Sequence, residues 1–360
     1  MTEPFGIACI QAAVRMIPTL SQTDSVIKEN LDRHMRLADM IVASGVGGRA
    51  GGEMKVGIYP EFSLQGIPCG PEASYKGDSF TKWVRKVGRT IPGDITDTFA
   101  KKSVELDMYL EAILWEKDTD FDCHFETAFI TDPKGKLVYK RRRLSVLSFP
   151  YITIDSPHDV YTEYLKKFGP DPMKAFFPVL ETPYGVLGSI ICCEMSVPEI
   201  ARALTLSGAE VLLHSTSEPG GAVVDGVHPR DLQRRARASD NMVYLASTNI
   251  GLIIDSPLPS HRDRGHSEIL DYRGSALSIM ETPGEAIISA VINVDTLRAR
   301  RMGGRWPVTH LRNDVFSSVY QIPIFPKDRK IRTTEKGKEL INEINESLAK
   351  RGILKKVKRT

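Results

Sequence analysis

Short apolar runs alternate with segments of helical period along most of the chain. The run FGIACIQ at residues 5–11 predicts a buried strand, and apolar residues at helical spacing predict a helix over residues 24–44. A second helix is predicted over residues 95–106. Four further runs predict strands in the first half of the chain: KVGIYP, MYLEAIL, FETAFIT and GKLVYK. The turn DPKG joins the last two.

The second half repeats this alternation. Strands are predicted at VLGSII, EVLLHS and MVYLAST, with helices beginning at Pro198 and near residues 231–241. SALSIM and AIISAVIN predict an antiparallel pair around ETPGE. Residues 148–175 are rich in Pro, Tyr and Asp and are expected to form an inserted loop.

Regular alternation without a linker favours one α/β domain, with mixed β-sheets flanked by helices. We assign it to residues 1–327. Residues 328–360 form a charged segment with a predicted helix over 334–350, which we expect to contact a partner subunit.

Charge and composition narrow the functional classes. The net charge of +3 over 360 residues gives no general attraction to nucleic acid, and the basic runs at 140–143 and near the C-terminus are most simply solvated. No apolar run approaches the roughly 18 residues of a membrane span. Five cysteines without a CxxC pair indicate reduced thiols and a cytoplasmic protein.

Several familiar motifs are either absent from the sequence or stand in the wrong structural context. GVGGRA at residues 45–50 loosely matches a dinucleotide fingerprint, but it follows a predicted helix rather than a strand. No GxSxG, HExxH or phosphate-binding loop is present, and the eight histidines form no metal-ligand spacing. The expectation is a protein that needs no metal and no organic cofactor.

The stretch GVLGSIICCEMSVPEIARAL carries the most specific chemistry. A predicted strand ends at Cys192, and Pro198 is suited to the first turn of the next helix. A thiol at such an elbow lies at the carboxyl end of a strand, where α/β folds place their ligands. Backbone N–H groups of the turn would suit an oxyanion. The alternative is that Cys192 and Cys193 are buried packing residues, as most free cysteines are.

Glu61 occupies the same kind of position after the strand VGIYP. A nucleophilic thiol needs a base, and a carboxylate at a neighbouring strand end is a candidate for that role. An ordinary turn acid that caps a helix is the alternative.

Taken in order, these pieces resemble the nitrilase superfamily of carbon–nitrogen hydrolases. The resemblance is carried by IACIQ, YPEFSLQG, PKGKLVYKRRRL, ICCEMSVPEIAR, RARASDNMVYLASTN and GHSEILDYRGSAL. It implies an αββα sandwich and a Glu-Lys-Cys triad, with Glu61 as general base. Counting back from Pro198-Glu199 makes Cys192 the nucleophile and Glu194 the following acid, so the side chain of Cys193 is expected to point elsewhere.

One position departs from the family pattern. The lysine motif ends here in Arg143, which stands where the family has its catalytic lysine. Alternation along a strand places Arg141 and Arg143 on one face and Lys140 on the other, so Lys140 is no simple substitute. A guanidinium offers permanent charge and forked donors, but it does not release a proton. We expect Arg143 to support catalysis with altered geometry.

The resemblance implies hydrolysis of a small amide to an acid and ammonia or an amine through a cysteine thioester. Pro-Glu after the nucleophile is similar to the amidase branches. The alternatives are a nitrilase acting on a nitrile, or a catalytically impaired binding or scaffold protein. A catalytic Cys192 is expected to have a depressed pKa, whereas a packing cysteine is inert. A homo-oligomer is also implied.

Overall fold

The computed structural model describes residues 2–43, 52–66, 78–144, 154–220, 227–255 and 263–355. Cys69 and the GVGGRA segment lie outside these ranges, as do residues 148–153 of the expected inserted loop.

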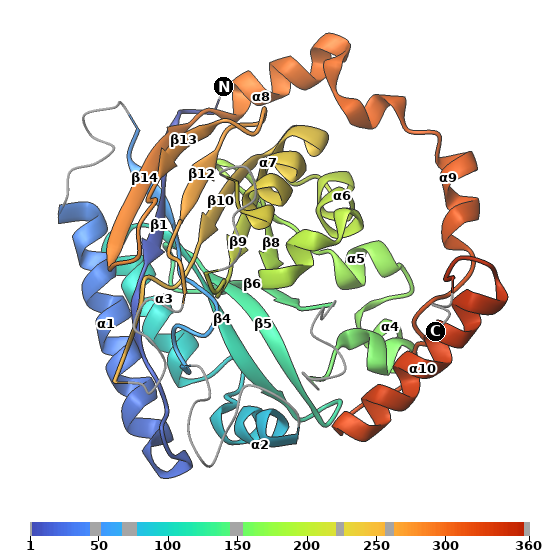
Figure 1. Cartoon of the computed structure of the whole chain (residues 1–360). Coiled ribbons are helices and arrows are strands. Elements are labelled where there is room, and N and C mark those ends of the chain that lie inside the picture. The colour runs from blue at the N-terminus through green and yellow to red at the C-terminus, as the bar shows by residue number, and fades with distance from the viewer. Residues whose placement is uncertain are drawn as a thin grey trace.

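Two six-stranded mixed sheets form the centre of the molecule (Figure 1). The first contains, in spatial order, β14 (Ala286–Ile292), β1 (Phe5–Gln11), β3 (Met54–Ile58), β4 (Tyr109–Asp118), β5 (Cys123–Thr131) and β6 (Leu137–Arg142). The second contains β13 (Ala276–Ile279), β12 (Glu268–Leu270), β10 (Tyr244–Thr248), β9 (Val211–Ser215), β8 (Gly185–Ile191) and β7 (Leu180–Thr182).

Parallel strands occupy the middle of each sheet. β1, β3 and β4 run parallel in the first sheet, and β8, β9 and β10 run parallel in the second. Their carboxyl ends place the residues after β3 and β8 where ligands bind in open α/β sheets. The inner faces of the two sheets share one apolar core, which includes Ile7, Val56, Leu187 and Val211.

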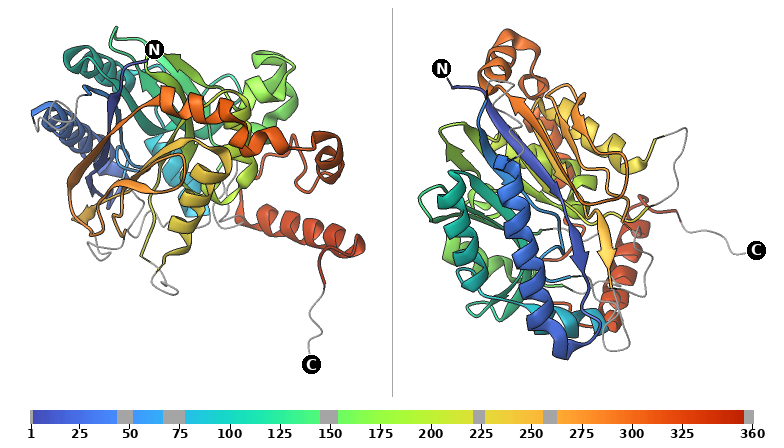
Figure 2. Two further views of the ribbon diagram at one scale, coloured as in Figure 1. Left: turned by 90° about the horizontal axis from the view of Figure 1, so that it is seen from above. Right: turned by 90° about the vertical axis from the view of Figure 1, so that its left-hand side faces the viewer.

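Helices cover the outer face of each sheet, and the two turned views separate the layers (Figure 2). α1 (Thr23–Ala43), α2 (Asp78–Val87) and α3 (Asp94–Leu106) pack on the first sheet through a core that includes Leu37, Trp83 and Phe99. α6 (Pro198–Leu206) and α7 (Pro229–Asn241) cover the second through Leu204 and Ala238. The predicted αββα sandwich is confirmed.

One strand pairing predicted from the sequence is wrong. The two runs around ETPGE do not pair with each other: β13 pairs with β12, whereas β14 pairs with β1 in the opposite sheet. Each run has enough apolar character to join a sheet edge, and its local pattern does not reveal which sheet supplies the partner. The connection between them therefore links one edge of each sheet.

The segment over residues 148–175 also differs from the expected loop. Its described part forms the 3₁₀ turn η3 (Pro157–Val160), α4 (Tyr161–Phe168) and α5 (Pro172–Phe176). Ser156 and Asp171 cap two of these elements, accepting hydrogen bonds from His158 N and Met173 N. Tyr164 and Phe176 pack against Phe121 and Phe125 at the end of the β4–β5 hairpin. Aromatic packing therefore orders a segment whose Pro and Asp residues suggested a loop.

After β14 the chain runs around the outside of the molecule (Figure 1). It forms α8 (Val294–Arg300), a π-helical segment (Arg301–Arg305), η6 (Pro307–His310), α9 (Asn313–Tyr320) and α10 (Thr334–Lys350). α9 leaves Val315, Val319 and Tyr320 exposed. The expected homo-oligomer stays a prediction.

The described chain also contains the parallel pair β2 (Ala13–Arg15) and β11 (Leu252–Ile254), and the turn η1 (Leu20–Gln22). Within the described ranges, no helix combines the length and apolar character that crossing a membrane requires.

Candidate active site

A strained elbow presents the predicted nucleophile. β8 ends at Ile191, and Cys192 follows with φ of 48° at the start of the 3₁₀ turn η4 (Cys192–Ser196). A positive φ is unfavourable for a residue with a side chain, so the surroundings must hold it. One restraint is His214, whose Nε2 donates to the Cys192 carbonyl oxygen over 3.0 Å. Cys192 as a residue is partly exposed to solvent.

A buried ion pair fixes the other side of this elbow. Arg141 on β6 contacts both oxygens of Glu194, with Nη1–Oε2 and Nη2–Oε1 distances of 2.7 and 2.9 Å. Both side chains are fully buried. Glu194 also accepts from the backbone N–H groups of Ile191 and Leu144. Burial raises the pKa of Glu194, but Arg141 and these donors outweigh it and hold the pKa below its ordinary value. The elbow is thereby tied to the opposite sheet.

Glu61 lies beside the elbow, three residues beyond the end of β3. Its Oε1 accepts from Arg143 Nη1 over 3.0 Å, and its Oε2 accepts from the backbone N–H of Ser217 over 2.9 Å. The carboxyl group also lies close enough to the Cys192 thiol to raise the pKa of that thiol. Only 1% of Glu61 is exposed. The structure therefore brings Glu61, Arg143 and Cys192 together, as their positions in the sequence suggested.

Arg143 has a second carboxylate partner that sequence reasoning missed. Glu126 on β5 faces it across the strand pair: Arg143 N donates to Glu126 O over 2.8 Å, and Arg143 Nη1 contacts Glu126 Oε2. The Glu126 carboxylate also helps to raise the pKa of Glu61. The turn DPKG predicts the hairpin but not this register: the pairing shifts by one residue between Ile130 and Thr131, so Thr127 opposes Arg142 and Glu126 opposes Arg143.

Cys193 corrects another expectation. Its side chain does not point away from the site: Sγ contacts Arg143 Nη2, and the Cys193 thiol raises the pKa of Cys192. The expectation relied on residues next to each other facing opposite ways, as they do along a strand. The 3₁₀ turn and the positive φ of Cys192 end that alternation.

In the resting site, the pKa values of Glu61 and Cys192 are both raised, which favours the neutral form of each group. Burial, followed by the nearby Glu126 carboxylate, raises the pKa of Glu61 well above its ordinary value, against the opposing effect of Arg143. The hydrogen bond from Cys193, followed by burial and Glu61, also raises the pKa of the Cys192 thiol. This direction is opposite to the depressed pKa expected from the sequence. The thiol therefore needs a base to remove its proton.

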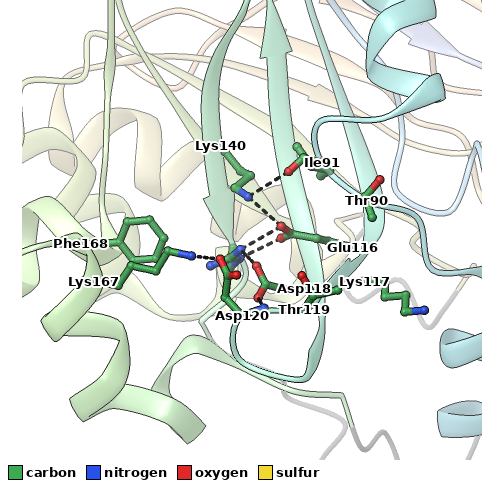
Figure 3. Close-up of a pocket in the computed structure, with 11 residues that line it drawn as sticks. Thr90, Ile91, Glu116, Lys117, Asp118, Thr119, Asp120, Lys140, Lys167 and Phe168 are labelled. Atoms are coloured by element: carbon green, nitrogen blue, oxygen red, sulfur yellow. Dashed lines mark hydrogen bonds and ion pairs between the residues drawn. The ribbon is translucent and has the colours of Figure 1, made fainter.

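Lys140 lies on the opposite face of β6, as strand alternation predicted. Its Nζ donates to Glu116 Oε1 over 2.8 Å in a cavity of about 280 Å³ away from the elbow (Figure 3). Arg142, on the same face, pairs with Glu116 and Asp118 and packs on the ring of Phe125. Lys140 and Arg142 are therefore occupied by contacts near the end of the β4–β5 hairpin. Of these neighbouring cations, Arg143 is the one that lies beside Cys192.

One group among the described residues has the composition of a metal site: Asp231, His266 and Glu268. Its two carboxylates already pair with arginines, because Arg234 contacts both and Arg264 contacts Asp231. Two guanidinium groups in contact with these carboxylates repel a further cation at the same place. The group is therefore better described as a buried ion-pair network.

Comparison with known proteins agrees with this arrangement. The family model for carbon–nitrogen hydrolases matches residues 7–302. The chain belongs to the carbon–nitrogen hydrolase family. It is 27% identical over 251 residues to a formamidase of Bacillus cereus and equally to one of Bacillus thuringiensis, with 68% of this chain aligned. The chain spans about 62% of the length of these relatives.

Solved structures of the nitrilase superfamily share the fold. A carbon–nitrogen hydrolase of Helicobacter pylori superimposes with a TM-score of 0.63 at 17% identity, over 89% of this chain and 99% of that one. A Nesterenkonia amidase from the nitrilase superfamily, solved as a variant, gives 0.56 at 17% identity, over 84% and 96%. The predicted membership of this superfamily is confirmed.

The ion pair under the elbow yields a stability prediction. Arg141→Met leaves the Glu194 carboxylate buried without its cation, so the free energy of unfolding should fall by about 3–5 kcal/mol. Urea denaturation followed by circular dichroism measures the loss. Adding Glu194→Gln removes the uncompensated charge and should recover part of it. A single variant within about 1 kcal/mol of the wild type would contradict a structural role for this pair.

Proposed function

We propose that the protein hydrolyses the C–N bond of a small amide to a carboxylic acid and ammonia or an amine, with Cys192 as nucleophile. One observation carries the proposal: the fold brings Glu61, Arg143 and Cys192 together, with Glu61 Oε1 3.0 Å from Arg143 Nη1 and the carboxyl group close enough to the Cys192 thiol for each to shift the pKa of the other. A nucleophile, its base and a cation therefore share one enclosed site, which is the arrangement that covalent catalysis requires.

In the first half of the reaction, Glu61 takes the thiol proton as the Cys192 sulfur attacks the carbonyl carbon. The negative charge that develops on the carbonyl oxygen would be stabilised by Arg143 and the backbone N–H groups of the elbow. Glu61 then passes the proton to the leaving nitrogen, and the C–N bond breaks to leave a thioester on Cys192. A water molecule that Glu61 deprotonates hydrolyses this thioester and releases the acid.

Glu126 gives Arg143 a place in this scheme. Arg143 cannot release a proton, so the proton that Glu61 accepts has to stay on a carboxyl group. Glu126 contacts the same Nη1 atom of Arg143, and its carboxylate helps to raise the pKa of Glu61. A higher pKa makes Glu61 a better acceptor for the thiol proton.

The substrate class follows from the relatives. The matched formamidases and the amidase of similar fold support an amide in place of a nitrile. Formamide is therefore the first substrate to assay, followed by longer aliphatic amides and a nitrile series.

We also propose that residues 328–360 form an accessory segment, because Arg332 ties this segment to Asp122 and Asp155 at distances of 3.2 and 3.4 Å.

Substitutions at the three central residues test the proposal. Cys192→Ala should lower kcat by at least about 1,000-fold because it removes the nucleophile. Glu61→Gln should lower it by about 100-fold or more because it removes the base. Arg143→Lys should also lower kcat/KM, since one ammonium cannot contact Glu61, Glu126 and Cys193 together. Ammonia release from the amide panel is the measurement.

Cys123→Ala provides the matched control, because this thiol is buried outside the site. It should leave ammonia release unchanged. Turnover that survives in Cys192→Ala would refute the mechanism. An increase in turnover in Arg143→Lys would identify the natural protein as a disarmed relative, and the search would turn to what it binds.

Glu126 produces a pH prediction. Glu61 works as a base only when deprotonated, so activity should fall as the pH drops through its raised pKa. Glu126→Gln removes a negative neighbour that contributes to raising this pKa. The pKa of Glu61 should then fall, and the acid limb of the kcat/KM profile should move to lower pH. An unchanged or higher midpoint would show that Glu126 does not act on the base.

A further inference from the structure

The proposed hydrolysis leaves the thiol of Cys193 without a role. This residue is 7% exposed, contacts the guanidinium of Arg143 and raises the pKa of the adjacent Cys192 thiol. Arg143 therefore touches Cys193 and also holds Glu61. The two sulfur atoms belong to adjacent residues, of which Cys192 is partly exposed and Cys193 is buried.

We propose that Cys192 and Cys193 form an oxidative modification site for small hydroperoxides. The Cys192 sulfur attacks one peroxide oxygen, the O–O bond breaks, and an alcohol or water leaves, so that Cys192 becomes a sulfenic acid. The Cys193 sulfur then attacks the Cys192 sulfur, the S–O bond breaks, and water leaves with the Cys193 proton. The product is a vicinal disulfide, and the hydroperoxide has accepted both electrons.

Groups already in the site assist each step. Glu61 lies close enough to the Cys192 thiol to shift its pKa, and takes its proton during attack on the peroxide, as it does in the proposed hydrolysis. Arg143 beside Cys193 favours the thiolate form of the second sulfur, because a neighbouring cation stabilises a thiolate. The first step uses Cys192, which is the more exposed of the two residues.

Two other described cysteines are poor competitors for the oxidant. Cys9 lies in β1 between the sheets, and Cys123 begins β5; both are fully buried. Burial, followed by the Glu111 carboxylate, raises the pKa of Cys9, and burial also raises the pKa of Cys123 to about 12. Buried thiols of this kind are inert. Oxidation should therefore concentrate on the elbow.

A disulfide between adjacent cysteines is readily reduced back to two thiols. Their Cα atoms are about 3.8 Å apart across a trans peptide, whereas ordinary disulfides span about 4.4–6.8 Å. The strain makes the bond easier to reduce, which is typical of regulatory disulfides. Without a second thiol, the sulfenic acid would proceed to the sulfinic acid, which ordinary thiols do not reduce. Cys193 thus protects the nucleophile while switching it off.

Mass spectrometry of the full-length reduced protein tests the proposal. After treatment with hydrogen peroxide, the mass of the protein measured before alkylation should fall by about 2 Da. Alkylation of the same treated protein under denaturing conditions should then label two fewer cysteines than in the untreated protein. Both should map to the peptide containing Cys192 and Cys193. Dithiothreitol should restore both sites. Cys193→Ala should instead gain about 32 Da at Cys192, and dithiothreitol should not reverse it. Cys123→Ala should behave as the wild type.

Three outcomes would overturn the proposal. Sulfinic acid at Cys192 with Cys193 still alkylated would show that the second thiol does not capture the intermediate. A loss of about 2 Da with only one alkylation site lost would indicate a cyclic sulfenamide. A disulfide from Cys192 to a more distant cysteine would also exclude it. Because mass is read without turnover, failure of the hydrolase proposal would appear separately, as absent ammonia release.

Discussion

The guanidinium groups of Arg141 on β6 and of Arg143, the residue just beyond the end of that strand, hold the site together, and each depends on a buried carboxylate from elsewhere in the chain. Arg141 pairs with Glu194 under the elbow, and Arg143 pairs with Glu61 and Glu126 beside the thiol. Charges removed from water are stable only when they are paired and hydrogen-bonded. The requirement fixes the distance between the sheets at this point, because the elbow belongs to one sheet and β6 to the other.

That constraint also explains how an arginine fits the lysine position. A longer, forked cation has to satisfy two Nη atoms in this buried position. Nη1 contacts both Glu61 and Glu126, and Nη2 contacts Cys193 Sγ. The cost is an additional buried acid next to Glu61. Arginine at this position is therefore consistent with a working site.

Much of the fold was predictable because its signals are local. Strand β1, helix α3 and the turn between β5 and β6 follow from apolar period and turn residues, and the motif order predicted the sandwich. Motif register selected Glu61, Arg143 and Cys192 as candidates, and the fold brings them together. Long-range choices were not predictable: the pattern of residues 286–292 does not distinguish pairing with β1 from pairing with β13. Residues 161–168 became helical through aromatic packing against Phe121.

The parts of the site that the sequence did not predict also depend on geometry beyond the local sequence pattern. Glu126 lies in a strand that reads as core, and its role appears only when the hairpin register places it opposite Arg143. The direction of Cys193 depends on the positive φ of the residue before it, which sequence alternation cannot anticipate. In both cases the functional contact arises from backbone geometry between elements.

The most direct test of the account is to trap the covalent intermediate. The protein is mixed with formamide or a longer amide, quenched in acid during turnover and examined by intact-mass and peptide mass spectrometry. The account predicts an acyl group attached to Cys192 as a thioester, sensitive to hydroxylamine and absent from Cys192→Ala. Turnover without any acyl adduct on this residue, or an adduct on Cys193 in its place, would contradict it.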